Sequence, residues 1–193
     1  MSYKYRKDNR TDEQFKKDIL DHSVAEKESS KIIKSYFEEV LDMRVLIEDN
    51  GIDNSGEIIK KKKISSTADY LFVFANGQKR LLEIKNHSEK YDFLTLKKNQ
   101  LEKYIKEDAT VVIFRENYML LIPSDTLQII KETYTPKIYG CYGGKEGYRL
   151  FAGDINDFIS SGKIENHVFS ETIRDMVVKQ IDVIFPKGSI YDK

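Results

Sequence analysis

The residues from Thr67 to His87, TADYLFVFANGQKRLLEIKNH, are the most informative part of the chain. Two apolar runs, DYLFVFA and KRLLEIK, flank Asn76–Gly77, a pair that is typical of tight hairpin turns. The pattern therefore predicts two antiparallel strands. Glu83 and Lys85 stand two positions apart in the second strand, so their side chains share one face. A carboxylate inside an apolar strand is costly to bury unless another group offsets its desolvation.

The position of Asp69 relative to these two charges depends on the turn. A two-residue loop, Asn76–Gly77, pairs Asp69 with Ile84 and aims its side chain at the opposite face of the hairpin. A three-residue loop, Asn76–Gln78, pairs Asp69 with Lys85 and puts all three charges on one face, as a bulge would also do. One residue of slip separates the two registers, and both leave the charges at the same end of the hairpin.

Hydrophobic periodicity and turn residues predict the remaining elements. Thr11 is expected to cap the first helix with Gln14 as its capping-box partner, and Ser124 is expected to cap a later helix. The expected elements are a helix from Thr11 to about Met43 with a break near Asp21–Ser23, strands over 44–48 and 57–64, the hairpin, a helix over 97–106, strands over 109–116 and 118–123, a helix over 124–134, an irregular hairpin over 135–153, and helices over 154–162 and after about 170.

This order of elements predicts the fold class. It indicates a single mixed α/β (α+β) domain over residues 1–193, with a central mixed β-sheet flanked by helices. The core is expected over about 24–134. The residues from about 135 to 193 are interpreted as an extension that serves recognition or dimerisation.

Composition limits the classes of protein to consider. The 193 residues carry 32 Lys and Arg against 32 Asp and Glu, so overall charge does not indicate nucleic-acid binding, although a local basic patch remains compatible with it. The single cysteine, Cys141, excludes an internal disulfide and a Cys-rich zinc site. A polar N-terminus and the lack of an apolar run of about 20 residues predict a cytoplasmic protein with no membrane segment.

Two carboxylates and one ammonium at the end of the hairpin suit phosphodiester hydrolysis. Mg²⁺ takes one or two carboxylates and keeps several waters, so Asp69 and Glu83 are candidate ligands for Mg²⁺, with Mn²⁺ as a substitute. A metal-bound water is a better nucleophile, and Lys85 can orient that water or stabilise the transition state. The lysine run nearby and one further lysine are candidate phosphate contacts. These DNA-binding candidates are Lys61, Lys62, Lys63 and Lys97.

Asp69 followed by Glu83-Ile84-Lys85 resembles the D…(D/E)-x-K signature of the PD-(D/E)xK nuclease superfamily, with Ala68 in place of the proline. The segment FLTLKKNQLEKY, residues 93–104, is similar to the helix that follows this motif in many members, including Holliday-junction resolvases and related phage nucleases. The resemblance spans residues 26 to 114, approximately.

This resemblance implies a restriction-endonuclease-like core and a Mg²⁺-dependent endodeoxyribonuclease. The backbone carbonyl of Ile84 joins the two carboxylates as a metal ligand. The helix after the motif is implied to point Gln100 at the site, and the first helix to supply a Glu, with Glu28 and Glu26 both open. The implied catalytic residues are Asp69, Glu83, Lys85, Gln100 and Glu28.

Two subclasses of nuclease remain open. One is a structure-specific enzyme such as a junction resolvase, and the other is a sequence-specific restriction or homing-type endonuclease. Paired incisions need two sites, which favours a homodimer in both cases. The alternative from a different class is a catalytically inactive nuclease-fold module that binds DNA.

Overall fold

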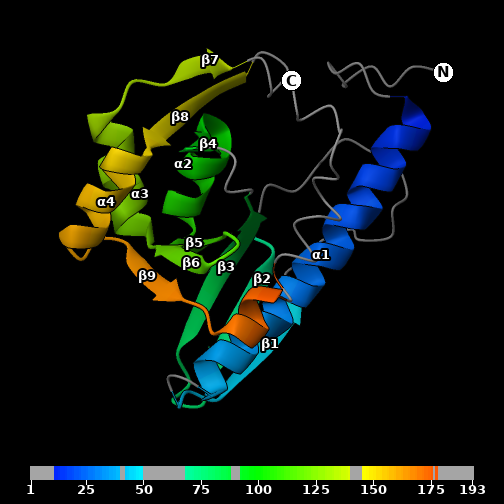
Figure 1. The fold of residues 1–193 in the computed structure, drawn as a ribbon. Helices are drawn as coiled ribbons and strands as arrows, with labels where there is room; N and C mark the ends of the chain where they lie inside the picture. The colour runs from blue at the N-terminus through cyan, green and yellow to red at the C-terminus, as the bar shows by residue number, and fades with distance from the viewer. Residues whose placement is uncertain are drawn as a thin grey trace.

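A computed structural model describes residues 11–39, 42–49, 68–87, 92–139, 145–175 and 177 (Figure 1). The elements, in chain order, are α1 (Asp12–Glu39), β1 (Val45–Asp49), β2 (Tyr70–Phe74), β3 (Lys79–Asn86), β4 (Phe93–Lys97), α2 (Lys98–Lys106), β5 (Ala109–Phe114), β6 (Tyr118–Ile122), α3 (Ser124–Thr133), β7 (Lys137–Tyr139), β8 (Lys145–Phe151), α4 (Ala152–Ser160) and β9 (Glu165–Val168).

The strands form two sheets. The main sheet has the order β1-β2-β3-β5-β6-β9, in which β3 and β5 run parallel and every other neighbouring pair runs antiparallel. The smaller sheet has the order β4-β8-β7 and is antiparallel. Parallel neighbours need a crossover connection, which here contains β4 and α2. The predicted mixed α/β class with a central mixed sheet flanked by helices is confirmed.

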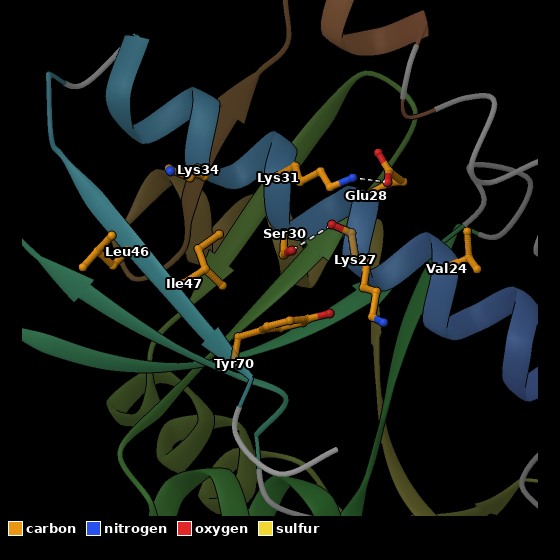
Figure 2. Close-up of a pocket in the computed structure, with 9 residues that line it drawn as sticks. All are labelled: Val24, Lys27, Glu28, Ser30, Lys31, Lys34, Leu46, Ile47 and Tyr70. Atoms are coloured by element: carbon orange, nitrogen blue, oxygen red, sulfur yellow. Dashed lines mark hydrogen bonds and ion pairs between the residues drawn. The ribbon is translucent and has the colours of Figure 1, made fainter. Parts of the chain in front are cut away.

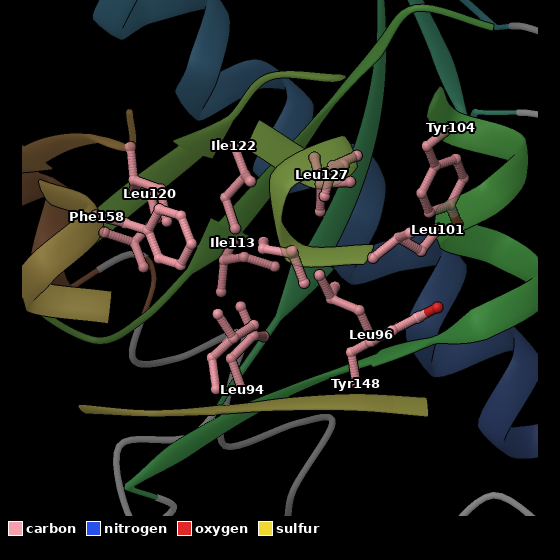
Figure 3. Packing of buried hydrophobic residues seen from close by; sticks show 14 of the residues in the cluster. Leu94, Leu96, Leu101, Tyr104, Ile113, Leu120, Ile122, Leu127, Tyr148 and Phe158 are labelled. Atoms are coloured by element: carbon pink, nitrogen blue, oxygen red, sulfur yellow. The ribbon is translucent and has the colours of Figure 1, made fainter. Parts of the chain in front are cut away.

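Two hydrophobic cores lie on the two faces of the main sheet. Helix α1 covers one face, where Ile33 and Phe37 pack with residues such as Phe72 and Ile84. The other face is covered by α2, α3, α4 and the smaller sheet (Figures 1 and 3). Strand β5 is buried along its whole length because both of its faces are covered, which explains its continuous apolar sequence.

Helix α1 differs from its prediction in one respect. The capping box at its start is confirmed, because the Thr11 N–H donates to Gln14 Oε1 at 2.7 Å and the Gln14 N–H donates to Thr11 Oγ1 at 3.2 Å. The break expected near Asp21–Ser23 is wrong, since the helix continues without interruption to Glu39. Weak helix formers cost only about 0.7 kcal/mol each, which packing of the following turns can offset.

Three other local predictions need correction. Residues 93–104 are similar in sequence to the helix that follows the motif, but residues 93–97 form strand β4 instead, with Leu94 and Leu96 buried. Ser124 does not cap α3: Pro123 is the N-cap residue, and the Ser124 hydroxyl donates to the Asp108 carboxylate instead. Strand β9 was not predicted and pairs with β6 at the edge of the main sheet.

The segment interpreted as an extension is, in its described part, built into the same two sheets. The predicted hairpin after residue 135 is present as β7 and β8, and the predicted helix is present as α4. Tyr148, Leu150 and Ile155 belong to the core on the α2 face. The strand expected over 57–64 lies outside the described residues.

Among the described helices, none has the length and apolar character needed to cross a membrane.

Candidate active site

The turn between β2 and β3 sets the register of the hairpin. The Phe74 N–H donates to the Gln78 carbonyl at 2.9 Å, and Tyr70 pairs with Leu82. The loop is therefore Ala75–Gly77, a three-residue loop that begins one position earlier than predicted, so both predicted registers are wrong. Gly77 has a φ of 82°, a left-handed conformation that suits the last position of such a loop.

This register brings the three charges onto one face. The last pair of the ladder is Tyr70 with Leu82, so the next residues, Asp69 and Glu83, lie opposite each other. Directly opposed residues share a face of the sheet. Lys85 lies two positions further along the same face, and its Nζ is 2.6 Å from Glu83 Oε1. The structure therefore groups Asp69, Glu83 and Lys85 on one face, as the predicted three-residue loop required. In that prediction Asp69 paired with Lys85, whereas in the structure it lies opposite Glu83.

Asp69 is held by the backbone of the neighbouring strand. The Ile84 N–H donates to Asp69 Oδ2 at 3.4 Å, just beyond Tyr70, where β2 begins. In a strand, the N–H and the carbonyl of one residue point to the same side. The Ile84 carbonyl therefore points to the same side of β3 as the Ile84 N–H, toward Asp69.

Burial and charge control the state of the lysine. Glu83 is only 6% exposed, whereas 26% of the Lys85 side chain is exposed. Burial by itself lowers the pKa of Lys85, but the adjacent Glu83 carboxylate, with further contributions from Tyr104 and Asp69, raises the pKa well above its ordinary value. Lys85 therefore remains protonated at neutral pH and acts as a cation and hydrogen-bond donor rather than as a base.

Tyr104, on α2, is a member of the site that the sequence did not predict. The side chain of Tyr104 hydrogen-bonds to Glu83, and the Lys85 Nζ lies 5.7 Å from the ring centroid. Burial, together with the charges of Glu83 and Asp69, raises the pKa of the phenol far above its ordinary value, against the opposing effect of Lys85. The available signal was spacing, because Gln100 and Tyr104 are four residues apart and share a helix face.

The structure places the other predicted residues in three different settings. Gln100 is half-buried on α2, one turn before Tyr104 on the same face, and so lies on the side of the helix that reaches the site. Lys97 ends β4 and lies in the smaller sheet. Lys61, Lys62 and Lys63 lie outside the described residues, as does the side chain of Glu26.

Glu28 is not brought to Glu83 by the described contacts. It lies on α1, which covers the opposite face of the main sheet, and it forms an ion pair with Lys31. Both residues line a groove of about 610 Å³, which Tyr70 also lines. Figure 2 shows the ion pair on α1 and the ring of Tyr70 on the neighbouring sheet. The sequence-based assignment of Glu28 to the catalytic group therefore remains a prediction.

The donors at the site fit a hard cation. Asp69, Glu83 and the Ile84 carbonyl are all oxygen ligands, the type that Mg²⁺ prefers, with waters completing its shell. No group of three or more His, Cys, Asp or Glu side chains with suitable geometry occurs within the described part of the chain, so a zinc-type cluster is not seen there. Glu83 is engaged by Lys85 and Tyr104, which hold its carboxylate in a defined position.

Comparison of the sequence with protein-family models gave no match, and no curated protein matched the chain.

Proposed function

We propose that this chain is a Mg²⁺-dependent endodeoxyribonuclease of the PD-(D/E)xK type, which hydrolyses phosphodiester bonds in DNA. The observation that carries the proposal is the grouping of Asp69, Glu83 and a protonated Lys85 on one face at the end of the hairpin. The mixed core also supports the proposal. It consists of helix α1, the antiparallel strands β1 to β3, and strand β5, which runs parallel to β3 and is reached through α2.

Each residue of the group has a role that follows from its contacts. Asp69, Glu83 and the Ile84 carbonyl would hold the metal, which when bound supplies a more acidic water and offsets charge on the phosphate. Lys85 carries a positive charge that can stabilise the negative charge developing on the phosphate oxygens. Tyr104 donates to Glu83 and so fixes the orientation of that carboxylate.

The proposal includes two kinds of DNA substrate. A structure-specific enzyme that cuts four-way junctions and a sequence-specific enzyme that cuts duplex sites both require this chemistry. Paired incisions favour a homodimer, because the described residues of each chain would supply one such group.

One observation favours the alternative of an inactive nuclease-fold module that binds DNA. Lys85 and Tyr104 already satisfy Glu83 within the chain, at 2.6 Å in the case of Lys85. A carboxylate compensated in this way is stable without a metal.

Cleavage of supercoiled plasmid and of synthetic four-way junctions tests the proposal. Both substrates are incubated with the protein in Mg²⁺ and in EDTA. Discrete plasmid fragments indicate a sequence-specific enzyme, and symmetric junction cuts indicate a resolvase. Binding of either substrate without any cleavage in Mg²⁺ would support the inactive module instead.

A further inference from the structure

The smaller sheet has one face that does not contribute to the core. Leu94, Leu96, Tyr148 and Leu150 point to the core. Side chains alternate along a strand, so the intervening residues lie on the other face. We call this the basic–aromatic face and define it by six side chains. They are Phe93, Lys97, Lys137, Tyr139, Arg149 and Phe151.

Three aromatic rings and one guanidinium contact one another in a row along the basic–aromatic face. The guanidinium carbon of Arg149 lies 3.8 Å from the Phe93 ring centroid and 4.1 Å from that of Tyr139, so the guanidinium is held between two rings. Phe93 in turn contacts Phe151 edge to face, with the ring centroids 6.4 Å apart and the ring planes at 71°. Gly147 lies on β8 between Arg149 and Lys145, the partner of Tyr139, so this position of the face carries no side chain.

The stack is accessible at its ends and positively charged. Phe151 is 53% exposed and Tyr139 is half-exposed. Lys97 and Lys137 both pair with Gly147, from opposite sides, and so lie in one row across the sheet. Within the described residues of these three strands, the face carries no acidic side chain, since Glu146 is on the opposite face and forms an ion pair with Lys98.

The face is connected to the candidate active site through α2. Lys97 is the last residue of β4 and the N-cap of α2. The same helix carries Tyr104 to Glu83. A strand of nucleic acid that lies on the basic–aromatic face would therefore reach the helix that contacts the catalytic carboxylate.

We propose that the basic–aromatic face binds single-stranded DNA. Unpaired bases expose flat faces that stack on aromatic rings, whereas a duplex hides those faces in its own base stack. Lysine and arginine beside the rings supply positive charge for a backbone that carries one phosphate per nucleotide. The choice of DNA rather than RNA rests on the proposed nuclease function, but binding itself does not depend on cleavage.

Fluorescence anisotropy with labelled oligothymidylate in EDTA tests this inference. Tyr139→Ala should weaken binding about tenfold, because base–ring stacking contributes on that order, and Tyr139→Phe should restore it. The matched control is Ile138→Ala, which changes the next residue on the same strand, is 70% exposed, lies on the other face and should leave binding unchanged.

Salt dependence separates the two kinds of contact. Lys137→Ala should reduce the slope of log affinity against log salt by about 0.7, the value for one phosphate contact on a single strand. Tyr139→Ala should weaken binding without changing that slope. Lys137 is exposed on an edge strand, so its variant tests the face without removing the half-buried Arg149 from between the rings.

Three results would overturn the inference. They are unchanged binding in Tyr139→Ala and Lys137→Ala, an equal loss in Ile138→Ala, and tighter binding of duplex DNA or oligouridylate than of oligothymidylate. Failure of the nuclease proposal can be distinguished from failure of this inference. If the protein binds oligothymidylate through this face but cuts no DNA in Mg²⁺, the binding inference holds and the proposed nuclease activity is wrong. If the protein cuts duplex DNA but does not bind oligothymidylate, the nuclease proposal holds and the binding inference is wrong.

Discussion

Replacement of Lys85 by methionine should destabilise the protein more than replacement of Glu83 by glutamine. Glu83 is 6% exposed and lies among apolar neighbours of β5, whereas Lys85 keeps 26% of its side chain exposed. Without Lys85, a buried carboxylate loses its cation. Without the Glu83 charge, the ammonium can still reach water.

The geometry sets the expected size of this effect. At 2.6 Å and an effective dielectric constant of about 20, the attraction between Lys85 and Glu83 is about 6 kcal/mol before desolvation is subtracted. Removing one partner of a buried pair typically lowers the free energy of unfolding by about 3–5 kcal/mol. Tyr104 continues to donate to Glu83, so we expect about 3 kcal/mol for Lys85→Met.

Urea denaturation of a double-mutant cycle measures this difference. The cycle contains the parent, Lys85→Met, Glu83→Gln and the double variant, all at pH 7.5. The double variant removes the unpaired charge and should be more stable than Lys85→Met alone. A Lys85→Met variant within about 1 kcal/mol of the parent would refute the reasoning, because exposed surface ion pairs typically contribute no more than about 1 kcal/mol.

Three further predictions concern the same group. The free energy of unfolding should fall as the pH rises above about 10, because the folded protein raises the pKa values of Tyr104 and Lys85. In an alkaline denaturation series, Tyr104→Phe should reduce that fall by up to about 1.4 kcal/mol per pH unit. Mg²⁺ should raise the Tm of Lys85→Met more than that of the parent, since two carboxylates then face the metal without a competing ammonium, and adding Asp69→Asn should remove the difference. In metal-free gel shifts, Asp69→Asn and Glu83→Gln should bind DNA at least as tightly as the parent, because each removes repulsion from phosphates; weaker binding by both would contradict this account.

The sequence predicted the members of the charged group better than their register. Alternating polarity placed Glu83 and Lys85 on one face, and the contacts bear this out. The turn was misassigned by one residue, because Asn76–Gly77 fits both a two-residue loop and the last two positions of the loop observed. The hydrogen bond from the Phe74 N–H to the Gln78 carbonyl distinguishes the two loops. It depends on the twist of both strands rather than on local composition.

Tertiary contacts account for the elements that local patterns missed. Strand β4 is adjacent to α2 in sequence and has only five residues, so its pattern merged with that of the helix. Strand β9 is polar, with the sequence ENHV, and is held by its pairing with β6 and by the hydrogen bond between the Tyr36 hydroxyl and His167 Nδ1 at 2.9 Å. The role of Tyr104 was likewise hidden, because its ring is apolar while its hydroxyl reaches Glu83.

Single-turnover cleavage of DNA in Mg²⁺, by the parent and by Glu83→Gln, tests the central claim most directly. The glutamine keeps the shape of the side chain and removes the charge that would hold the metal. The parent should cut in Mg²⁺ and not in EDTA, and Glu83→Gln should be slower by on the order of 10²-fold while its circular dichroism matches the parent. A folded Glu83→Gln variant that cuts at the parental rate would contradict the account.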